Sequence, residues 1–347
     1  MKVDRAVRRS LLRALEVFVV ACGLAVTIYC VLFIRYLYTT PPFEGWEPKQ
    51  VVVEKGEPFR DVVKKLAREG VISSEHFFAF LGFVTGSTKK IQAGEYLFPA
   101  PSRPVHVLSK LVRGDVRKYY VLIPEGANVY EIAERLADMG LVDRERFLSL
   151  ATSREVARKF GIDSRSLEGY LFPDTYVFVK GMGEEAILRV MVERFREVVT
   201  PEMEERAREM GLTLDQVITV ASIVEKETSV DSEKPIIASI IYRRLKKGMR
   251  LQMDPTVIYG LKKWDGKLTR EDLRTPNPFN TYVIKGLPPG PISNPGEKSI
   301  RAALYPADTD YLYFVSRNNG THYFSRTLRE HINAVNRYQR RRWRRRR

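Results

Sequence analysis

The sequence predicts an α+β protein behind one N-terminal transmembrane helix. Residues 17–34 carry no charged side chain. Two later stretches repeat one another, and each alternates strand-like and helix-like patterns. A helix that is apolar on all sides is then followed by loops rich in Pro and Gly. We therefore expect an anchor helix, a small α/β module used twice and a mixed α+β domain, and a chain of 347 residues has room for two or three domains.

Residues 17–38 are expected to cross a membrane once. The 18 uncharged residues 17–34 approach the minimum length of a spanning helix, and Tyr36 and Tyr38 add aromatic side chains at its end. Residues 1–16 carry a net charge of +3, which predicts a cytoplasmic N-terminus and an extracytoplasmic body. A cleaved signal peptide is the alternative, but no small-residue cleavage site follows the apolar run. An uncleaved, single-pass anchor in the inner cell membrane is therefore favoured.

The net charge of +16 does not predict a body that binds nucleic acid. Eight arginines lie in residues 337–347 without any acid, and residues 1–16 carry +3, which leaves +5 for all residues between them. Such a body has an ordinary mixed surface. The arginine-rich tail, residues 339–347, is expected either to be attracted to anionic lipid or acidic polymer, or to be a solvated tail without a specific partner.

Cysteine and histidine usage argues against disulfide, thiol and metal chemistry in the exported body. Cys22 and Cys30 both lie inside the apolar segment, so the rest of the chain has no cysteine. The four histidines show no spacing typical of metal ligands. We therefore expect no metal site and no cofactor.

After a Pro-rich linker at residues 39–49, the chain contains an internal duplication. Residues 52–80 align without gaps on residues 122–150, at an offset of 70. Each copy has the pattern strand, Gly turn, amphipathic helix, second helix, strand. This outline resembles LysM modules, which bind N-acetylglucosamine polymers. We expect such modules at 50–117 and 118–180, and the alternative is a duplicated spacer that binds nothing.

The most informative segment is a helix expected from residue 214 to about 227. It belongs to the core, residues 181–338, of a domain that is expected at 118–338 and includes the second copy of the repeat. Thr213 and Gln216 form the pattern of a capping box. Residues 217–224 are apolar around the whole circumference, which predicts burial on all sides. The helix then ends in Glu225 and Glu227, although acidic side chains oppose the helix dipole at this end.

Helix stability does not explain these glutamates, so a functional role is the favoured interpretation. The stacking of Glu225 on Ala221 and Ser222 puts its carboxyl at the edge of an apolar environment, where a carboxylic acid stays protonated and can donate a proton. Glu227 lies about 200° away around the helix, so the two cannot face one another. The alternative is two surface glutamates at a frayed helix end.

Downstream, a loop region rich in Pro, Gly, Asn and aromatic residues is expected at residues 251–256, 277–282 and 286–292. Long loops inside a domain are usually functional, and their amide, carboxylate and phenol groups suit the hydroxyls and acetamides of a sugar. Residues 311–315 and 320–324 are expected to form a hairpin. Its aromatic side chains are interpreted as core, whereas His322 fits either a core or a site.

Four motifs, in this order behind an anchor, resemble the endolytic murein transglycosylases, also called the YceG-like family. They are LEGYLFPDTY at 167–176, ASIVEKET at 221–228, LQMDPTVIYG at 251–260 and GLPPGPISNPG at 286–296. The resemblance covers nearly all of the chain from the anchor to Tyr338. Arg243 and Phe279 depart from it, since the family usually has Asn and Tyr there.

The resemblance implies a lyase that cuts β-1,4 bonds between N-acetylmuramic acid and N-acetylglucosamine in nascent peptidoglycan strands. Glu225 would be the catalytic acid and base, and the muramyl C6 hydroxyl would close a 1,6-anhydro ring. Such an enzyme could end glycan elongation, and the synthases that extend the strands are candidate partners. The implied substrate contacts are Glu227, Gln252, Asp254, Asn280 and Tyr282.

Two other function classes compete with this hypothesis. A peptidoglycan-binding scaffold would have the same modules and only structural glutamates. A nucleic-acid-binding protein is disfavoured because the charge is confined to the two ends and the body is expected outside the cell.

Overall fold

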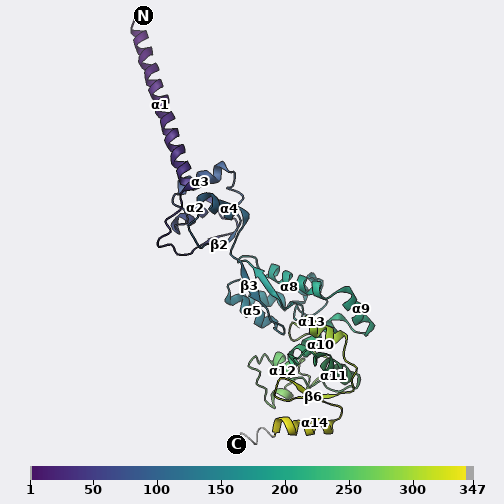
Figure 1. Ribbon diagram of the computed structural model, residues 1–347. Helices are drawn as coiled ribbons and strands as arrows, with labels where there is room; N and C mark the ends of the chain where they lie inside the picture. Colours follow the sequence, from purple (N-terminus) through teal and green to yellow (C-terminus); the bar gives the residue numbers. More distant parts are fainter. Residues whose placement is uncertain (1, 341–347) are drawn as a thin grey trace. The chain divides into compact units, whose positions relative to one another are not determined.

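The computed structural model describes residues 2–340 and contains two compact units. The first unit reaches Lys118 and also includes Val179–Gly181, and the second contains Tyr119–Phe178 and the chain from Met182 onward. Helices and short two-stranded sheets occur in both units (Figure 1). The predicted α+β class is confirmed. Residues 341–347 of the predicted arginine-rich tail lie outside the described residues.

The N-terminal apolar segment is part of one continuous helix, α1 (Lys2–Tyr38). Its stretch Leu11–Tyr38 is long and apolar enough to cross a membrane, and its most apolar part is not buried inside the protein. Cys22 and Cys30 are both exposed on this helix. One N-terminal apolar helix is therefore present, as predicted.

The remainder of the first unit forms a two-stranded sheet covered by three helices. The elements are β1 (Lys49–Val53), α2 (Phe59–Arg68), α3 (Glu75–Val84), β2 (Gly94–Phe98) and α4 (Pro104–Arg113). Strands β1 and β2 pair antiparallel, with Val51 opposite Tyr96. The predicted linker is not detached from this core, because the indole N–H of Trp46 donates to the Phe98 carbonyl oxygen (3.3 Å).

The second unit begins with the same succession of elements. They are β3 (Tyr119–Leu122), α5 (Val129–Asp138), α6 (Arg144–Ala151), an additional α7 (Arg154–Lys159) and β4 (Thr175–Phe178), and β3 pairs antiparallel with β4. The first strand and first helix of the two copies start 70 residues apart, as predicted.

The gapless alignment is wrong for the second helix of each copy. Ser74 caps the N-terminus of α3 and Asp143 caps that of α6, an offset of 69. Phe78 and Phe147 are fully buried at matching positions of these helices. The second copy therefore has one residue fewer before its second helix, and each side chain of α3 corresponds to one 69 positions later.

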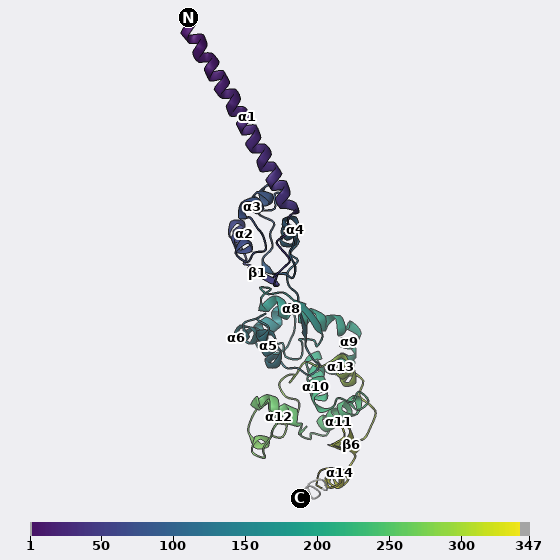
Figure 2. The same ribbon diagram turned by 60° about the vertical axis from the view of Figure 1, so that its left-hand side comes forward.

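The centre of the second unit is α10 (Leu214–Glu227). Thr213 and Gln216 form the predicted capping box, and residues 217–224 are all buried, so both predictions are confirmed. The helix packs against α11 (Lys234–Lys246) and α13 (Glu297–Leu304) (Figure 2). Two further helices, α8 (Glu184–Val198) and α9 (Pro201–Glu209), precede it.

Asn294 joins the second copy of the repeat to the segment before α13. Its side-chain oxygen accepts hydrogen bonds from the backbone N–H groups of Gly169 (2.9 Å) and Leu171 (2.8 Å). Its amide nitrogen donates to the Ala127 carbonyl oxygen (2.8 Å) and to the buried Glu168 carboxyl (3.1 Å). All polar atoms of this buried side chain are thus used.

Close packing explains the glycine of the LEGYLF motif. Gly169 has a φ of +90°, and a Cβ atom there would lie 2.6 Å from Pro291 and 2.8 Å from Ile218. A side chain would be strained by the backbone conformation and would also clash with α10.

The first segment predicted as a loop, residues 251–256, instead runs into a helix. A helix, α12 (Asp254–Leu261), begins at Asp254, and a 3-10 turn, η1 (Asp272–Arg274), follows. Pro255 stands in the first turn of α12, where a proline is compatible with a helix. The predicted hairpin is confirmed as β5 (Tyr313–Ser316) paired with β6 (His322–Ser325), and α14 (Leu328–Val335) and a π-helix, η2 (Asn336–Arg340), end the described chain.

Candidate active site

The last turn of α10 carries two glutamates with different surroundings. The chain leaves the helix at Thr228, whose backbone is extended. Glu225 and Glu227 lie on different sides of the turn, as the helical phase predicts. Each carboxyl therefore contacts a different group of neighbours, which come from distant parts of the chain.

The carboxyl of Glu225 is tied to two neighbouring helices. Its carboxylate lies 3.3 Å from the ammonium of Lys234 at the start of α11, and both side chains are almost completely buried. Its second oxygen accepts the backbone N–H of Gly296 (3.0 Å), the N-cap residue of α13. Both oxygens of the Glu225 carboxyl are therefore engaged by neighbouring helices. The apolar environment expected for this carboxyl is not found.

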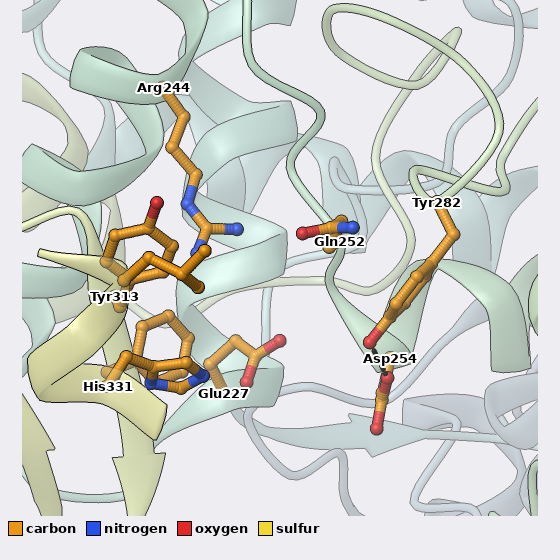
Figure 3. A pocket seen from close by; sticks show the side chains of 9 residues that line it. Glu227, Arg244, Gln252, Asp254, Tyr282, Tyr313 and His331 are labelled. Atoms are coloured by element: carbon orange, nitrogen blue, oxygen red, sulfur yellow. Dashed lines mark hydrogen bonds between the residues drawn. The ribbon is translucent and has the colours of Figure 1, made fainter. Parts of the chain in front are cut away.

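Glu227 lines a cavity of about 420 Å³, a volume typical of ligand sites. Figure 3 shows its side chain between Arg244, Tyr313 and His331 on one side and Gln252, Asp254 and Tyr282 on the other. Among the described residues, none forms a hydrogen bond or salt bridge with its carboxyl. The group is thus available to a ligand, whereas Glu225 does not line this cavity.

Burial and, to a smaller extent, the nearby negative charge of Asp254 raise the pKa of Glu227, Arg244 lowers it, and together they bring the pKa to about 8. At neutral pH this carboxyl is therefore mostly protonated. A carboxylic acid with a pKa near the working pH is the group that general acid catalysis requires.

Arg244 forms one wall of the cavity and is fixed by the backbone. Its guanidinium donates to the carbonyl oxygens of Leu312 (2.8 Å) and Leu251, and it stacks over the ring of Tyr313 at 5.3 Å. Because α11, β5 and the segment before α12 all meet at this one side chain, Arg244 both shapes the wall and brings a positive charge to the cavity.

The opposite wall contains three of the predicted substrate-contact residues. Asp254, at the start of α12, accepts a hydrogen bond from the Tyr282 hydroxyl (2.6 Å). Gln252 has a left-handed φ of +52°, and its backbone N–H donates to the Thr281 carbonyl oxygen (3.1 Å). A non-glycine residue in this conformation is held there by its surroundings. The structure thus brings Glu227, Gln252, Asp254 and Tyr282 together.

Asn280 is not part of the cavity wall, so its expected contact with substrate is not supported. The side chain is fully buried. Its amide nitrogen donates to the carbonyl oxygens of Asp272 (3.2 Å) and Thr275 (2.8 Å), and its oxygen accepts the N–H of Tyr282 (3.0 Å). Asn280 instead fixes the loop that presents Tyr282.

His331 belongs to the cavity and was missed by sequence reasoning. Its ring stacks on Tyr313 at 5.3 Å, and its buried Nδ1 atom has no hydrogen-bond partner in the described part of the chain. Burial, together with Arg244, lowers its pKa. The spacing of the histidines gave no signal for it. The other histidine in question, His322, lies outside the cavity lining and binds Glu233 through Nδ1 (2.7 Å).

The remaining cavity residues that sequence reasoning missed are Arg244, Tyr313, Phe314 and Leu328. Arg244 follows Arg243, where the chain departs from the family pattern, but the surrounding sequence does not show that the Arg244 side chain points into the cavity. The aromatic residues of β5 had been assigned to the core, and Phe314 does pack against the core as well as lining the cavity.

Known proteins resemble this chain over most of its length. The sequence model of the YceG-like family matches residues 51–337. A Bacillus subtilis protein named endolytic murein transglycosylase is 32% identical over 82% of this chain and 83% of its own length. A Streptococcus pneumoniae protein of the same name is 25% identical, and the match spans 60% of that protein.

A solved structure gives the same result at the level of the fold. The crystal structure of a YceG-like protein from Listeria monocytogenes superimposes with a TM-score of 0.57 and is 33% identical. The match covers 83% of this chain and 99% of the Listeria chain. On the family pattern and these relatives together, the chain belongs to the YceG-like family.

Proposed function

We propose that the chain is a membrane-anchored lytic transglycosylase that cuts inside peptidoglycan strands, with Glu227 as its catalytic acid. The observation that carries this proposal is the Glu227 carboxyl, which lines a cavity of about 420 Å³ and has no hydrogen-bond or ion-pair partner among residues 2–340. The relatives named endolytic murein transglycosylase supply the substrate class. Glu225 was the sequence-based choice, but its pairing with Lys234 argues for a structural role.

In this mechanism one carboxyl acts twice. Protonated Glu227 donates its proton to the oxygen of the β-1,4 bond as the bond from that oxygen to muramyl C1 breaks. The C6 hydroxyl of the same muramyl residue then attacks C1 and closes the 1,6-anhydro ring, and its proton returns to Glu227. No water is consumed, so the summed mass of the two products equals that of the substrate strand.

Because Asp254 also lies in the cavity, hydrolysis is a second candidate reaction. Two carboxyl groups, those of Glu227 and Asp254, line this cavity. Glycoside hydrolases use such a pair, in which one carboxyl group protonates the leaving oxygen and the other either activates a water molecule or attacks the sugar carbon itself. Here Asp254 is engaged with the Tyr282 hydroxyl, which favours a supporting role for it.

Mass spectrometry of the products decides between these reactions. Uncrosslinked glycan strands incubated with the full chain should yield anhydromuramyl ends. Products heavier by one water would replace the lytic reaction with hydrolysis. A chain that binds the strands but leaves them intact would support the non-catalytic scaffold instead.

Cleavage should fall as pH rises through about 8, because Glu227 then loses the proton that it must donate. Asp254→Asn removes a negative charge that raises the pKa of Glu227, so the fall should move to lower pH. The measurement is kcat/KM against pH for both proteins. An alkaline limb that does not move in the Asp254 variant would contradict the role of Glu227 as the acid.

The remaining features of the proposal concern position in the cell. We place α1 as a single-pass anchor in the inner membrane, with a cytoplasmic N-terminus and the catalytic unit outside. This arrangement gives access to nascent strands and to the synthases that extend them. The strand-helix-helix-strand units around β1 and β3 are proposed as LysM-like modules, and glycan binding by them stays a prediction.

A further inference from the structure

The outer face of α3 has no part in the proposed catalysis. An ordinary surface helix has one apolar face and one polar face. In α3, Phe78, Leu81 and Gly82 are buried in the core of the first unit. Beyond the exposed Glu75 and His76 of its first turn, the outer side of α3 is also apolar, and Phe83 and Val84 are 75% and 61% exposed. The helix therefore has a face that is apolar and uncovered.

A second face of α3 packs on the anchor helix through an aromatic cluster. Tyr29 and Phe33 of α1 contact Phe80 of α3, with ring centroids 5.4 Å and 4.9 Å apart. Farther along α1, Tyr36 contacts Phe77 at 5.4 Å, and its hydroxyl donates to the Ser74 carbonyl oxygen (3.3 Å). Both views show α3 beside the end of α1 (Figures 1 and 2).

These contacts show that α3 lies against the last turns of the apolar part of α1. Tyr29 contacts Phe80, and its hydroxyl also lies 3.1 Å from Nε2 of His76 near the start of α3. Phe83 and Val84 follow Phe80 by about one helical turn. Tyr29 and Phe33 belong to the segment of α1 that is proposed to lie in the membrane.

The length of the anchor places this contact at the membrane surface. The uncharged segment lies between Glu16 and Arg35, and its 18 residues span about 27 Å as a helix, close to the thickness of the hydrocarbon core. Tyr29 and Phe33 belong to the last two turns of that segment. Side chains of α3 that touch them must then lie at the outer boundary of the same bilayer.

The second copy of the repeat provides an internal comparison. With the structural offset of 69, Phe77, Phe80 and Phe83 correspond to Arg146, Ser149 and Thr152 of the second copy. The three residues of the second copy are exposed and polar. The matching core positions stay apolar in both copies, as Phe78 and Phe147 show. The additional apolar faces are thus confined to the copy that adjoins the anchor.

From these observations we infer that α3 docks on the outer leaflet of the membrane, with Phe83 and Val84 inserted at the boundary between headgroups and acyl chains. An apolar helix face of this kind is typical of interfacial helices. Lys89 and Lys90, both exposed just after α3, suit the anionic headgroups beside it. This inference rests on the proposed membrane anchor. Docking of α3 would hold the first unit against the bilayer.

Spin labels in the full chain, reconstituted in phosphatidylcholine and phosphatidylglycerol vesicles, test the inference. With the two native cysteines replaced by Ser, single labels are placed at Phe83→Cys, Val84→Cys and the matched control Thr152→Cys. A protein that keeps Cys22 reports on the anchor. Accessibility to oxygen, relative to a water-soluble nickel complex, should be high at Cys22, Phe83 and Val84 and low at Thr152.

Each other outcome overturns a distinct statement. If the accessibilities at positions 83 and 84 equal that at 152 while Cys22 has the accessibility of a lipid-exposed site, α3 does not dock on the membrane but α1 is still an anchor. If the label at Cys22 is as accessible to the nickel complex as a water-exposed site, α1 is not a membrane anchor. Labels at 83 shielded from both reagents, with spin-spin broadening that disappears on dilution by unlabelled protein, would show that a second copy of the chain covers this face.

Discussion

Replacing Glu227 by Gln should lower strand cleavage by about 10²–10⁴-fold, the usual contribution of a general acid. The amide keeps the shape of the side chain but cannot donate a proton to the leaving oxygen. Because the Glu227 carboxyl lines the cavity without a partner among the described residues, no structural contact is lost. The measurement is the rate of anhydromuramyl end formation, together with thermal unfolding to show that the fold is kept.

The same variant has a second signature, in the pH dependence of stability. The folded pKa of Glu227, about 8, lies above its ordinary value of 4.5, so the native state retains a proton that the unfolded chain releases. The stability of the unchanged protein therefore falls between pH 4.5 and 8. Glu227→Gln removes this fall, so the variant should be the more stable protein at pH 8.5 and equal at pH 4.5.

Glu225→Gln, two residues earlier in the same helix, is the matched control. It removes the charge that faces Lys234, and breaking a buried ion pair costs about 3 kcal/mol, the low end of the usual range because the amide oxygen still accepts one hydrogen bond. We expect a lower melting temperature and cleavage within tenfold of the unchanged protein when both are folded. The reverse result, an inactive but stable Glu225 variant beside an active Glu227 variant, would return the acid role to Glu225.

Local sequence patterns predicted the features that local interactions determine. The uncharged run gave the apolar helix, Thr213 and Gln216 gave the start of α10, and residues 217–224 gave its burial. The register between the two copies failed after the first helix, because one residue is absent before the cap at Asp143 and side-chain similarity alone concealed the gap. A proline in the first turn also concealed α12.

The choice between Glu225 and Glu227 lay beyond local patterns. Helical phase places the two carboxyls on different sides, but it does not say which side opens into a cavity. That is decided by Lys234 and Gly296 around one carboxyl and by Arg244 and Asp254 around the other. His331 joins the cavity from α14, more than 100 residues later in the chain, where the sequence gives no sign of the contact.

Replacing Asn294 by Ala should destabilise the second unit by about 4 kcal/mol. The change leaves the buried N–H groups of Gly169 and Leu171 without an acceptor, and each buried unsatisfied group costs about 1–3 kcal/mol. It also removes the donor to Glu168. Chemical unfolding followed by circular dichroism measures the loss, and Asn319→Ala, at an exposed turn, should change stability by less than about 1 kcal/mol.

The effect of Asn294→Ala should reach the active site because the neighbouring residues hold α10. The backbone N–H of Ile292 donates to the Ser222 hydroxyl (3.1 Å), and the Ser293 hydroxyl donates to the Ser222 carbonyl oxygen (3.2 Å). Loss of the Asn294 contacts loosens this segment against the helix that ends in Glu227. Cleavage should therefore decline at a lower temperature than in the unchanged protein, in step with unfolding; a stable variant with unchanged melting would show that the Asn294 network does not hold the unit together.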